Sequence, residues 1–342
     1  MRIRWRTRVT AGRAAALAGP PLGMSLVSLS LVGLSVMGLS LVGLATPARA
    51  GRTDDPVLQD LGIAECARDV NGLGVVVTDT HVYRQGRTYP LPRGLDTASR
   101  INDQGQIAGT AGGVAALWDG RSVVRLGVAD PADTYSYATG LNERGVVVGT
   151  SGSFGGPTHA FVWRAGVMHV LPGLSGNAGA SDVNDAGLVS GYAWEGAATQ
   201  RAVVWTPDGN LTQLGTLGGH SLAAAINNRG DAVGYSYSAS PGGSMRAVRW
   251  LLGQGPVPVD VDGAVLALAA DVNDRGRVVG NLAPVGGPQQ GFWRDGAGPV
   301  RPVRPVVAGD TTVLTAVNEH GTAVGCEFSA DESRAVLRYG PH

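Results

Sequence analysis

Short apolar runs, rich in β-branched residues and bounded by Gly, Pro, Asn or Asp, recur along most of the chain. No stretch keeps an apolar period of about 3.6 residues, so the pattern predicts many short strands rather than helices. In one representative stretch we expect strands over 180–184, 188–193, 201–205 and 211–214. Four such strands joined by tight turns predict one antiparallel sheet.

This unit recurs seven times, and each copy contains an apolar residue, an asparagine, two variable residues and a glycine. The repeat asparagines are Asn71, Asn102, Asn142, Asn184, Asn227, Asn273 and Asn318. Their spacing, 31 to 46 residues, is typical of β-propeller blades. We expect each asparagine side chain to bond the backbone two residues on, and each glycine to adopt a positive φ in a hairpin turn.

Two further landmarks accompany the turns. A large residue suited to fill the space between sheets ends the third expected strand: Tyr83, Trp118, Trp163, Trp205, Trp250, Trp293 and, in the last copy, Arg338. An apolar residue ends the fourth: Leu91, Leu126, Leu171, Leu214, Val259 and Val303. The last copy has no fourth strand of its own, whereas residues 57–61 resemble one without its sheet.

The expected fold is therefore all-β, a seven-bladed β-propeller of four-stranded antiparallel blades, closed by an N-terminal strand that completes the last blade. It would occupy 51–342 as a single domain. We prefer it to an open solenoid because closure removes exposed sheet edges. Closure would also make the first and last copies neighbours. These copies contain Cys66 and Cys326, the only cysteines, so we predict a disulfide between them, with two buried free thiols as the alternative.

Residues 1–50 resemble a secretory signal peptide. Arginines precede an apolar stretch, and Ala48 and Ala50 supply the small residues of a cleavage site, so we expect cleavage after Ala50. An uncleaved membrane anchor is the alternative. The whole chain has 27 basic and 27 acidic residues, and six of the arginines lie before residue 51, so 51–342 carries 21 minus 27, or −6. This charge argues against nucleic acid or an anionic membrane surface as a partner. Once the signal peptide is cleaved, we expect no stable membrane insertion.

No constellation for catalysis, metal binding or cofactor binding stands out. The histidines fall at unrelated repeat positions, without zinc-ligand spacing. Acidic residues follow five repeat asparagines, and we interpret them as solvated turn residues rather than as a calcium rim: Asp103, Glu143, Asp185, Asp274 and Glu319. The aromatic pairs Tyr192 and Trp194, and Tyr235 and Tyr237, are candidates for a stacking surface that binds a ligand. Packing between blades is the alternative.

One copy contains His159-Ala160-Phe161, followed by Leu171-Pro172-Gly173-Leu174 and Asp182-Val183-Asn184. This pattern resembles the HAF-repeat family of extracellular repeat proteins, and the resemblance extends over essentially all of 51–342. Other copies depart from the literal triplet. The resemblance implies a secreted repeat protein, and it implies no reaction or catalytic residues.

We therefore expect a secreted, monomeric, non-catalytic binding or scaffold protein without cofactors, whose partner is an extracellular glycan or protein. The alternative is an extracellular propeller enzyme, a lyase or glycosidase, with its active site on the central axis. That alternative requires a polar residue to break the repeat pattern near the axis. Glu195, Glu327 and His320 are the candidates from sequence.

Overall fold

Every regular element in the described part of the chain is a β-strand. The computed structural model describes residues 58–239, 243–251, 253–259, 264–329 and 332–338, all within the unit Leu39–His342. No helix able to cross a membrane occurs among these residues. The predicted signal peptide, 1–50, lies outside them.

The strands form four-stranded antiparallel sheets in chain order. One sheet contains β2 (Ala67–Val70), β3 (Val76–Thr78), β4 (His81–Arg84) and β5 (Arg87–Pro90), and the next contains β6 (Thr97–Ile101), β7 (Ile107–Ala111), β8 (Val114–Trp118) and β9 (Val123–Gly127). Then come β10 (Tyr135–Leu141), β11 (Val147–Gly152), β12 (Thr158–Arg164) and β13 (Val167–Val170), and after them β14 (Ala178–Val183), β15 (Val189–Glu195), β16 (Thr199–Trp205) and β17 (Leu211–Gln213).

The next two groups of strands belong to one eight-stranded sheet. They are β18 (Gly218–Ile226), β19 (Ala232–Ser238), β20 (Met245–Trp250) and β21 (Pro256–Pro258), followed by β22 (Ala264–Val272), β23 (Arg277–Pro284), β24 (Gln290–Asp295) and β25 (Arg301–Pro302). A single parallel pair, Met245 with Leu266, joins the two groups. Each group is otherwise an antiparallel sheet like the others.

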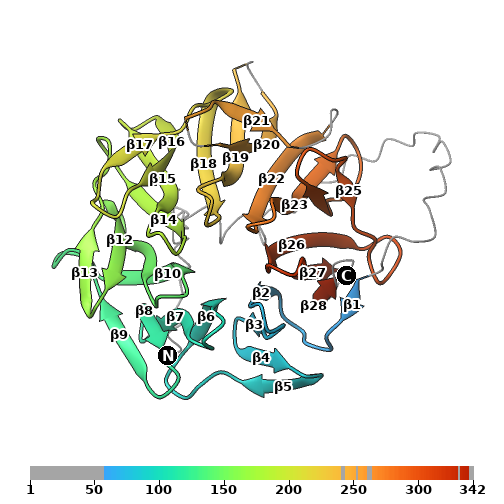
Figure 1. Ribbon diagram of the computed structural model, residues 1–342, viewed down its shortest axis with the longest axis horizontal. Helices are drawn as coiled ribbons and strands as arrows, with labels where there is room; N and C mark the ends of the chain where they lie inside the picture. Colours follow the sequence, from blue (N-terminus) through green and yellow to red (C-terminus); the bar gives the residue numbers. More distant parts are fainter. Residues whose placement is uncertain (1–57, 240–242, 252, 260–263, 330–331, 339–342) are drawn as a thin grey trace, which may run out of the picture. The chain divides into compact units, whose positions relative to one another are not determined.

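The last sheet combines strands from the two ends of the described chain. It contains β26 (Thr311–Val317), β27 (Ala323–Phe328) and β28 (Ser333–Arg338), and β1 (Gln59–Asp60) pairs antiparallel with β28. In Figure 1 the blue β1 lies beside the red β28. The strand expected near 57–61 therefore does occupy the fourth position of the last sheet.

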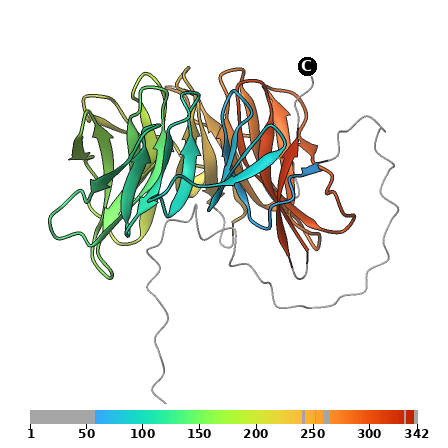
Figure 2. The same cartoon turned by 90° about the horizontal axis from the view of Figure 1, so that it is seen from below.

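The first strand of each sheet lies nearest a common centre, and the outer strands β5, β9, β13 and β17 lie furthest from it (Figure 1). In the side view of Figure 2 most strands run roughly between the upper and the lower end of the unit. Apolar clusters fill the spaces between neighbouring sheets. For example, Val148 in β11 packs in one cluster with Val183 in β14 and Trp205 in β16.

The repeat turns have the predicted geometry. The side-chain oxygen of Asn71 accepts a hydrogen bond from the N–H of Leu73, two residues on, and Asn142, Asn227 and Asn318 do the same in their turns. The fourth turn position is a glycine with φ between 73° and 83° in all seven copies. A side chain would be strained in this conformation, which explains why glycine recurs there.

The third-strand landmark was assigned wrongly in one copy. In β15 and β16 the residue opposite Val189 is Trp205, but in β23 and β24 the residue opposite Val278 is Arg294. Trp293 is one position earlier and therefore points to the other side of the sheet. The sixth and seventh copies thus both carry an arginine at this position.

The structure confirms the disulfide between Cys66, which precedes β2, and Cys326 in β27, with their Cα atoms 4.9 Å apart. The bond joins residues separated by 260 positions and ties the first copy to the last. In the chain-entropy account, a cross-link over so long a loop stabilises the fold by restricting the unfolded chain.

We expect the Cys66→Ala/Cys326→Ala double variant to lose about 2–5 kcal/mol of unfolding free energy. Denaturant unfolding with and without a reductant is the measurement. Reductant should destabilise the wild-type protein and leave the double variant unchanged. Equal stability of the two proteins under oxidising conditions would contradict the prediction.

Candidate functional site

The repeat asparagines are joined to one another by hydrogen bonds at one end of the unit. Each side-chain Nδ2 donates to the backbone carbonyl of the asparagine in the next copy, over 2.8–3.1 Å. The last of these bonds runs from Asn318 to the carbonyl of Asn71 in the first copy. We call the seven bonds the amide cycle. Because each Oδ1 also accepts an N–H four residues on, each asparagine fixes both its own turn and its neighbour.

The residues that follow the asparagines form a second series of bonds. The N–H of Gly72 donates to the Asp103 carboxylate, and the N–H of Asp103 donates to Glu143. The series continues through Asp185, Asn228 and Asp274 to Glu319. These side chains therefore bridge neighbouring sheets, a role that their interpretation as solvated turn residues did not include.

Charged side chains also stand two residues before the asparagine in four copies. They are Asp69, Arg100, Asp182 and Asp271. Both oxygens of Asp69 accept backbone N–H groups, one from Val70 and one from Ile101 in the next sheet. Asp182 and Asp271 bond the next sheet in the same way, through Ile226 and Val317. The three carboxylates are thus clamps between sheets.

These charges influence one another. Burial, together with the negative charge of Asp182, raises the pKa of Asp271 to about 7. Burial also raises the pKa of Asp69 and of Asp182, against the opposing effect of the Arg100 guanidinium. Burial disfavours the charge on Arg100, but the three carboxylates outweigh it, so its pKa lies above the usual value.

Five of the seven repeat asparagines, the residues of the second series and the four charged side chains line a cavity of about 280 Å³. Among the described residues no three His, Cys, Asp or Glu side chains are placed to hold a metal ion. Sequence reasoning did not single out Asp69, Arg100, Asp182 or Asp271. A signal was present, because a charged residue recurs at one fixed distance from the repeat asparagine.

The aromatic candidates lie at the other end of the strands. Trp194 is near the end of β15, away from the Asn184 turn. Tyr192 and Tyr235 are only 6% and 5% exposed, and burial raises the pKa of each hydroxyl. Trp194 and Tyr237 are partly exposed. Of the four predicted residues, only these two present a surface to a ligand.

The exposed ring of His220 lies between Trp194 and Tyr237, with centroid distances of 6.0 and 6.3 Å. We call Trp194, His220 and Tyr237 the aromatic rim. The Nδ1 of His220 accepts the backbone N–H of Gln200 at 3.0 Å. This bond places the ring proton on Nε2, which leaves a hydrogen-bond donor beside two aromatic rings.

The other candidates for axial chemistry are engaged elsewhere or exposed. The buried Glu327 accepts N–H groups of Val306 and Val307 at 2.6 and 2.9 Å. Glu195 forms an ion pair with Arg201 at 3.1 Å, and His320 is exposed in its turn. None of the three lines the axial cavity.

Solved structures with the same arrangement of sheets decide the fold. The β-propeller domain of the Trilobed protease from Pyrococcus furiosus is 14% identical over 84% of this chain and 95% of that one, with a TM-score of 0.52. The fold is that of a β-propeller. The acylaminoacyl peptidase from Pyrococcus horikoshii is 12% identical over 82% of this chain, with a TM-score of 0.53, and this chain spans 53% of its length. The SapL1 lectin is 12% identical, covering 82% and 97% of the two chains, with a TM-score of 0.39.

No protein-family model and no curated protein sequence matches the chain. The resemblance to HAF repeats therefore remains a prediction. What the protease domain and the peptidase share with this chain is the propeller fold, and a shared fold does not by itself assign a function.

Removing one amide of the cycle should destabilise the fold. We expect Asn184→Ala to cost about 1–3 kcal/mol of unfolding free energy, because it removes the side-chain partner of the Leu188 N–H and one of the two N–H groups that the Asn227 carbonyl accepts, the other being that of Gly230. Denaturant unfolding measures the loss. Asn210→Ala, at an exposed asparagine outside the cycle, is the matched control and should cost less than about 0.5 kcal/mol. A similar cost for both variants would contradict this role.

The enclosed carboxylates should make the protein less stable as the pH rises. The folded-state pKa of Asp271, about 7, exceeds the unfolded value of roughly 3.9, so its contribution to stability is complete below about pH 4 and is lost towards pH 7. Thermal melts at about pH 5 and pH 8 should show a lower midpoint at the higher pH, and the fall should be smaller in Asp271→Asn. Asp208→Asn, in an exposed turn, should behave as the wild-type protein does. An unchanged fall in Asp271→Asn would refute this assignment.

Proposed function

We propose that the protein is a secreted, non-catalytic β-propeller of seven four-stranded blades that binds an extracellular glycan or protein. Three observations support a closed ring. The strand β1 pairs with β28, the amide cycle returns from Asn318 to Asn71, and the disulfide joins Cys66 to Cys326. The disulfide is also compatible with an oxidising compartment, as expected after export.

The aromatic rim carries this proposal. Trp194 and Tyr237 present partly exposed ring surfaces, and the Nε2 of His220 offers a donor between them. Aromatic faces next to planar polar groups suit a sugar ring, whose apolar face stacks while its hydroxyls form hydrogen bonds. Asp69, Asp182 and Asp271 already accept backbone N–H groups, which occupies the carboxylates that an axial enzyme would need. This favours a binding function for the protein over catalysis at the axis.

The second candidate function is an enzyme, a lyase or glycosidase, that works in the axial cavity. The pKa of Asp271, about 7, favours it, because a carboxyl group that titrates near neutral pH can serve as a general acid or base. Two observations oppose it. Both oxygens of Asp271 accept backbone N–H groups, and the cavity, about 280 Å³, is at the lower limit for small-molecule sites.

A glycan array probed with the purified protein tests the binding function. We expect a restricted set of glycans to bind, and Trp194→Ala to weaken that binding about tenfold or more, as is usual for an aromatic hot spot. Tyr89→Ala removes a partly exposed tyrosine of β5, away from the rim, and should leave glycan binding unchanged. Equal effects of the two variants would contradict the rim as the site. Release of reducing ends from a bound glycan, abolished by Asp271→Asn, would instead favour the enzyme.

A further inference from the structure

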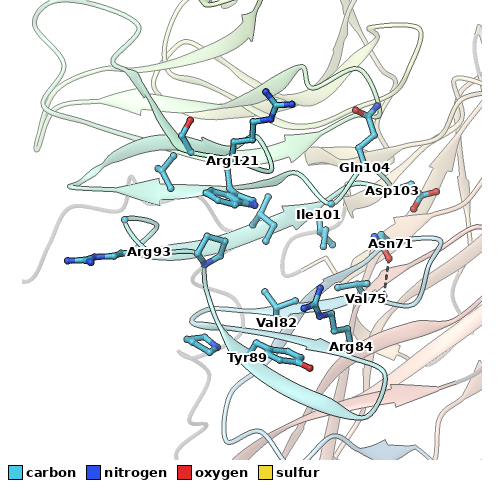
Figure 3. A pocket seen from close by; sticks show the side chains of 18 of the residues that line it. Asn71, Val75, Val82, Arg84, Tyr89, Arg93, Ile101, Asp103, Gln104 and Arg121 are labelled. Atoms are coloured by element: carbon cyan, nitrogen blue, oxygen red, sulfur yellow. Dashed lines mark hydrogen bonds between the residues drawn. The ribbon is translucent and has the colours of Figure 1, made fainter.

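A groove separates the sheet β2–β5 from the sheet β6–β9 (Figure 3). Its volume is about 980 Å³, and both sheets contribute to its lining. Most of the apolar lining is aliphatic, with Val75 just before β3, Val82 in β4 and Ile107 in β7, and Trp118 of β8 also contributes. Leu73, in the turn beside it, is 75% exposed. Exposed apolar surface of this kind often marks a binding site.

At the groove Val82 stands where two other copies carry a long side chain, and where the third and fourth copies carry the valines Val162 and Val204. Val82 has the same register position as Arg249 in β20 and Trp293 in β24. Arg249 extends to Asp231, with 2.6 Å between Nη2 and Oδ2, and the Trp293 ring lies 4.2 Å from the guanidinium carbon of Arg338. In those two copies a long side chain occupies space beside the sheet, which the valine leaves empty.

Four exposed arginines surround the groove: Arg84, Arg93, Arg121 and Arg125. None of them forms an ion pair with any residue that the structure describes. The Arg84 guanidinium stacks 4.7 Å from the centre of the Tyr89 ring, which orients it along the edge of the groove. The one acid among the lining residues, Asp103, already accepts the N–H of Gly72. The groove therefore offers four positive charges to a ligand.

The charge of the groove contrasts with that of the rest of the protein. Residues 51–342 carry 21 arginines and 27 acids, a net charge of −6. A local cluster of guanidinium groups attracts an anionic ligand, whereas the acidic remainder repels an extended polyanion such as DNA. Guanidinium groups also match carboxylates in geometry, because they can bind them through two parallel hydrogen bonds.

The apolar lining distinguishes between two anionic ligands, an acidic peptide and an acidic glycan. Sugars stack on flat aromatic faces, and two aromatic residues line the groove. Trp118 is partly buried and Arg84 covers one face of Tyr89, whereas Val75, Val82, Ile101, Ile107 and Val123 present branched aliphatic side chains. Branched aliphatic surfaces suit the valine, leucine or isoleucine side chains of a peptide. In an extended peptide successive side chains alternate between two faces, so apolar residues can meet the apolar lining while acids meet the arginines.

We propose that this groove binds an extended, acidic segment of a partner protein. Its carboxylates bind Arg84, Arg93, Arg121 and Arg125, and its alternate aliphatic side chains pack on Val75, Val82 and Ile107. The site is separate from the aromatic rim, and its evidence is independent of any glycan binding there. A protein with both sites would link a glycan to an acidic protein, which is a scaffold function.

Fluorescence anisotropy with a labelled peptide of about 12 residues, in which Asp or Glu alternates with Val or Leu, tests the proposal. The purified protein should bind this peptide and not the same sequence with Lys in place of the acids. Arg84→Gln/Arg121→Gln should weaken binding about tenfold or more and reduce its dependence on salt. The matched control, Arg144→Gln/Arg164→Gln, changes two exposed arginines of another repeat and should have no effect.

Two further variants locate the site. Val82→Trp places a large ring where β24 has Trp293, and should abolish peptide binding in a protein whose thermal melt shows that it is folded. Trp194→Ala should leave peptide binding intact. The proposal is overturned if the acidic peptide does not bind, if the two arginine pairs have equal effects, or if Trp194→Ala weakens binding as much as Val82→Trp. Binding of polygalacturonate but not of the peptide, lost in Arg84→Gln/Arg121→Gln, would assign the groove to acidic glycans instead.

Discussion

Each repeat asparagine has a buried amide that must find hydrogen-bond partners, and it finds them in two places at once. Its oxygen holds its own turn, and its Nδ2 holds the backbone of the next copy. The shape of every turn is thereby coupled to the position of the neighbouring sheet. Because a buried polar group without a partner is costly, no copy can move without a penalty in the copies on either side. This constraint explains why the asparagine recurs in all seven copies.

The same end of the unit gathers negative charge as a consequence. Carboxylates suit backbone N–H groups as acceptors, and they occur both two residues before and one residue after the asparagine. Their mutual repulsion and their burial raise the pKa of Asp271, Asp69 and Asp182, and Arg100 offsets part of this cost. The axial residues are therefore committed to holding sheets together. Of the surfaces available to a ligand, the aromatic rim lies at the other end of the strands, and the arginine-lined groove begins beside Asn71 and Asp103, between the first two sheets.

Local features were predictable from the sequence, and features that depend on register were not. The asparagine turns were foreseen because each turn is determined within five residues. The disulfide of Cys66 and Cys326 was foreseen because only one arrangement of the copies brings them together. Trp293 was misassigned, since a shift of one residue moves a side chain to the other side of a strand. Nothing in the spacing of the tyrosines indicated that Tyr192 and Tyr235 would be buried and Trp194 partly exposed.

The sequence by itself determined the repeat, its turns and the all-β character of the chain, because hydrogen bonds and backbone conformation within one hairpin depend on adjacent residues. Only the tertiary structure decided which groups meet between sheets. The second partner of each repeat amide is 31 to 46 residues further along the chain, or at its other end. The groove likewise forms between two particular sheets, whose lining side chains come from separate copies. Such contacts depend on how sheets that are distant in sequence pack against each other. Side-chain length and register determine that packing together, and the order of residues alone does not specify it.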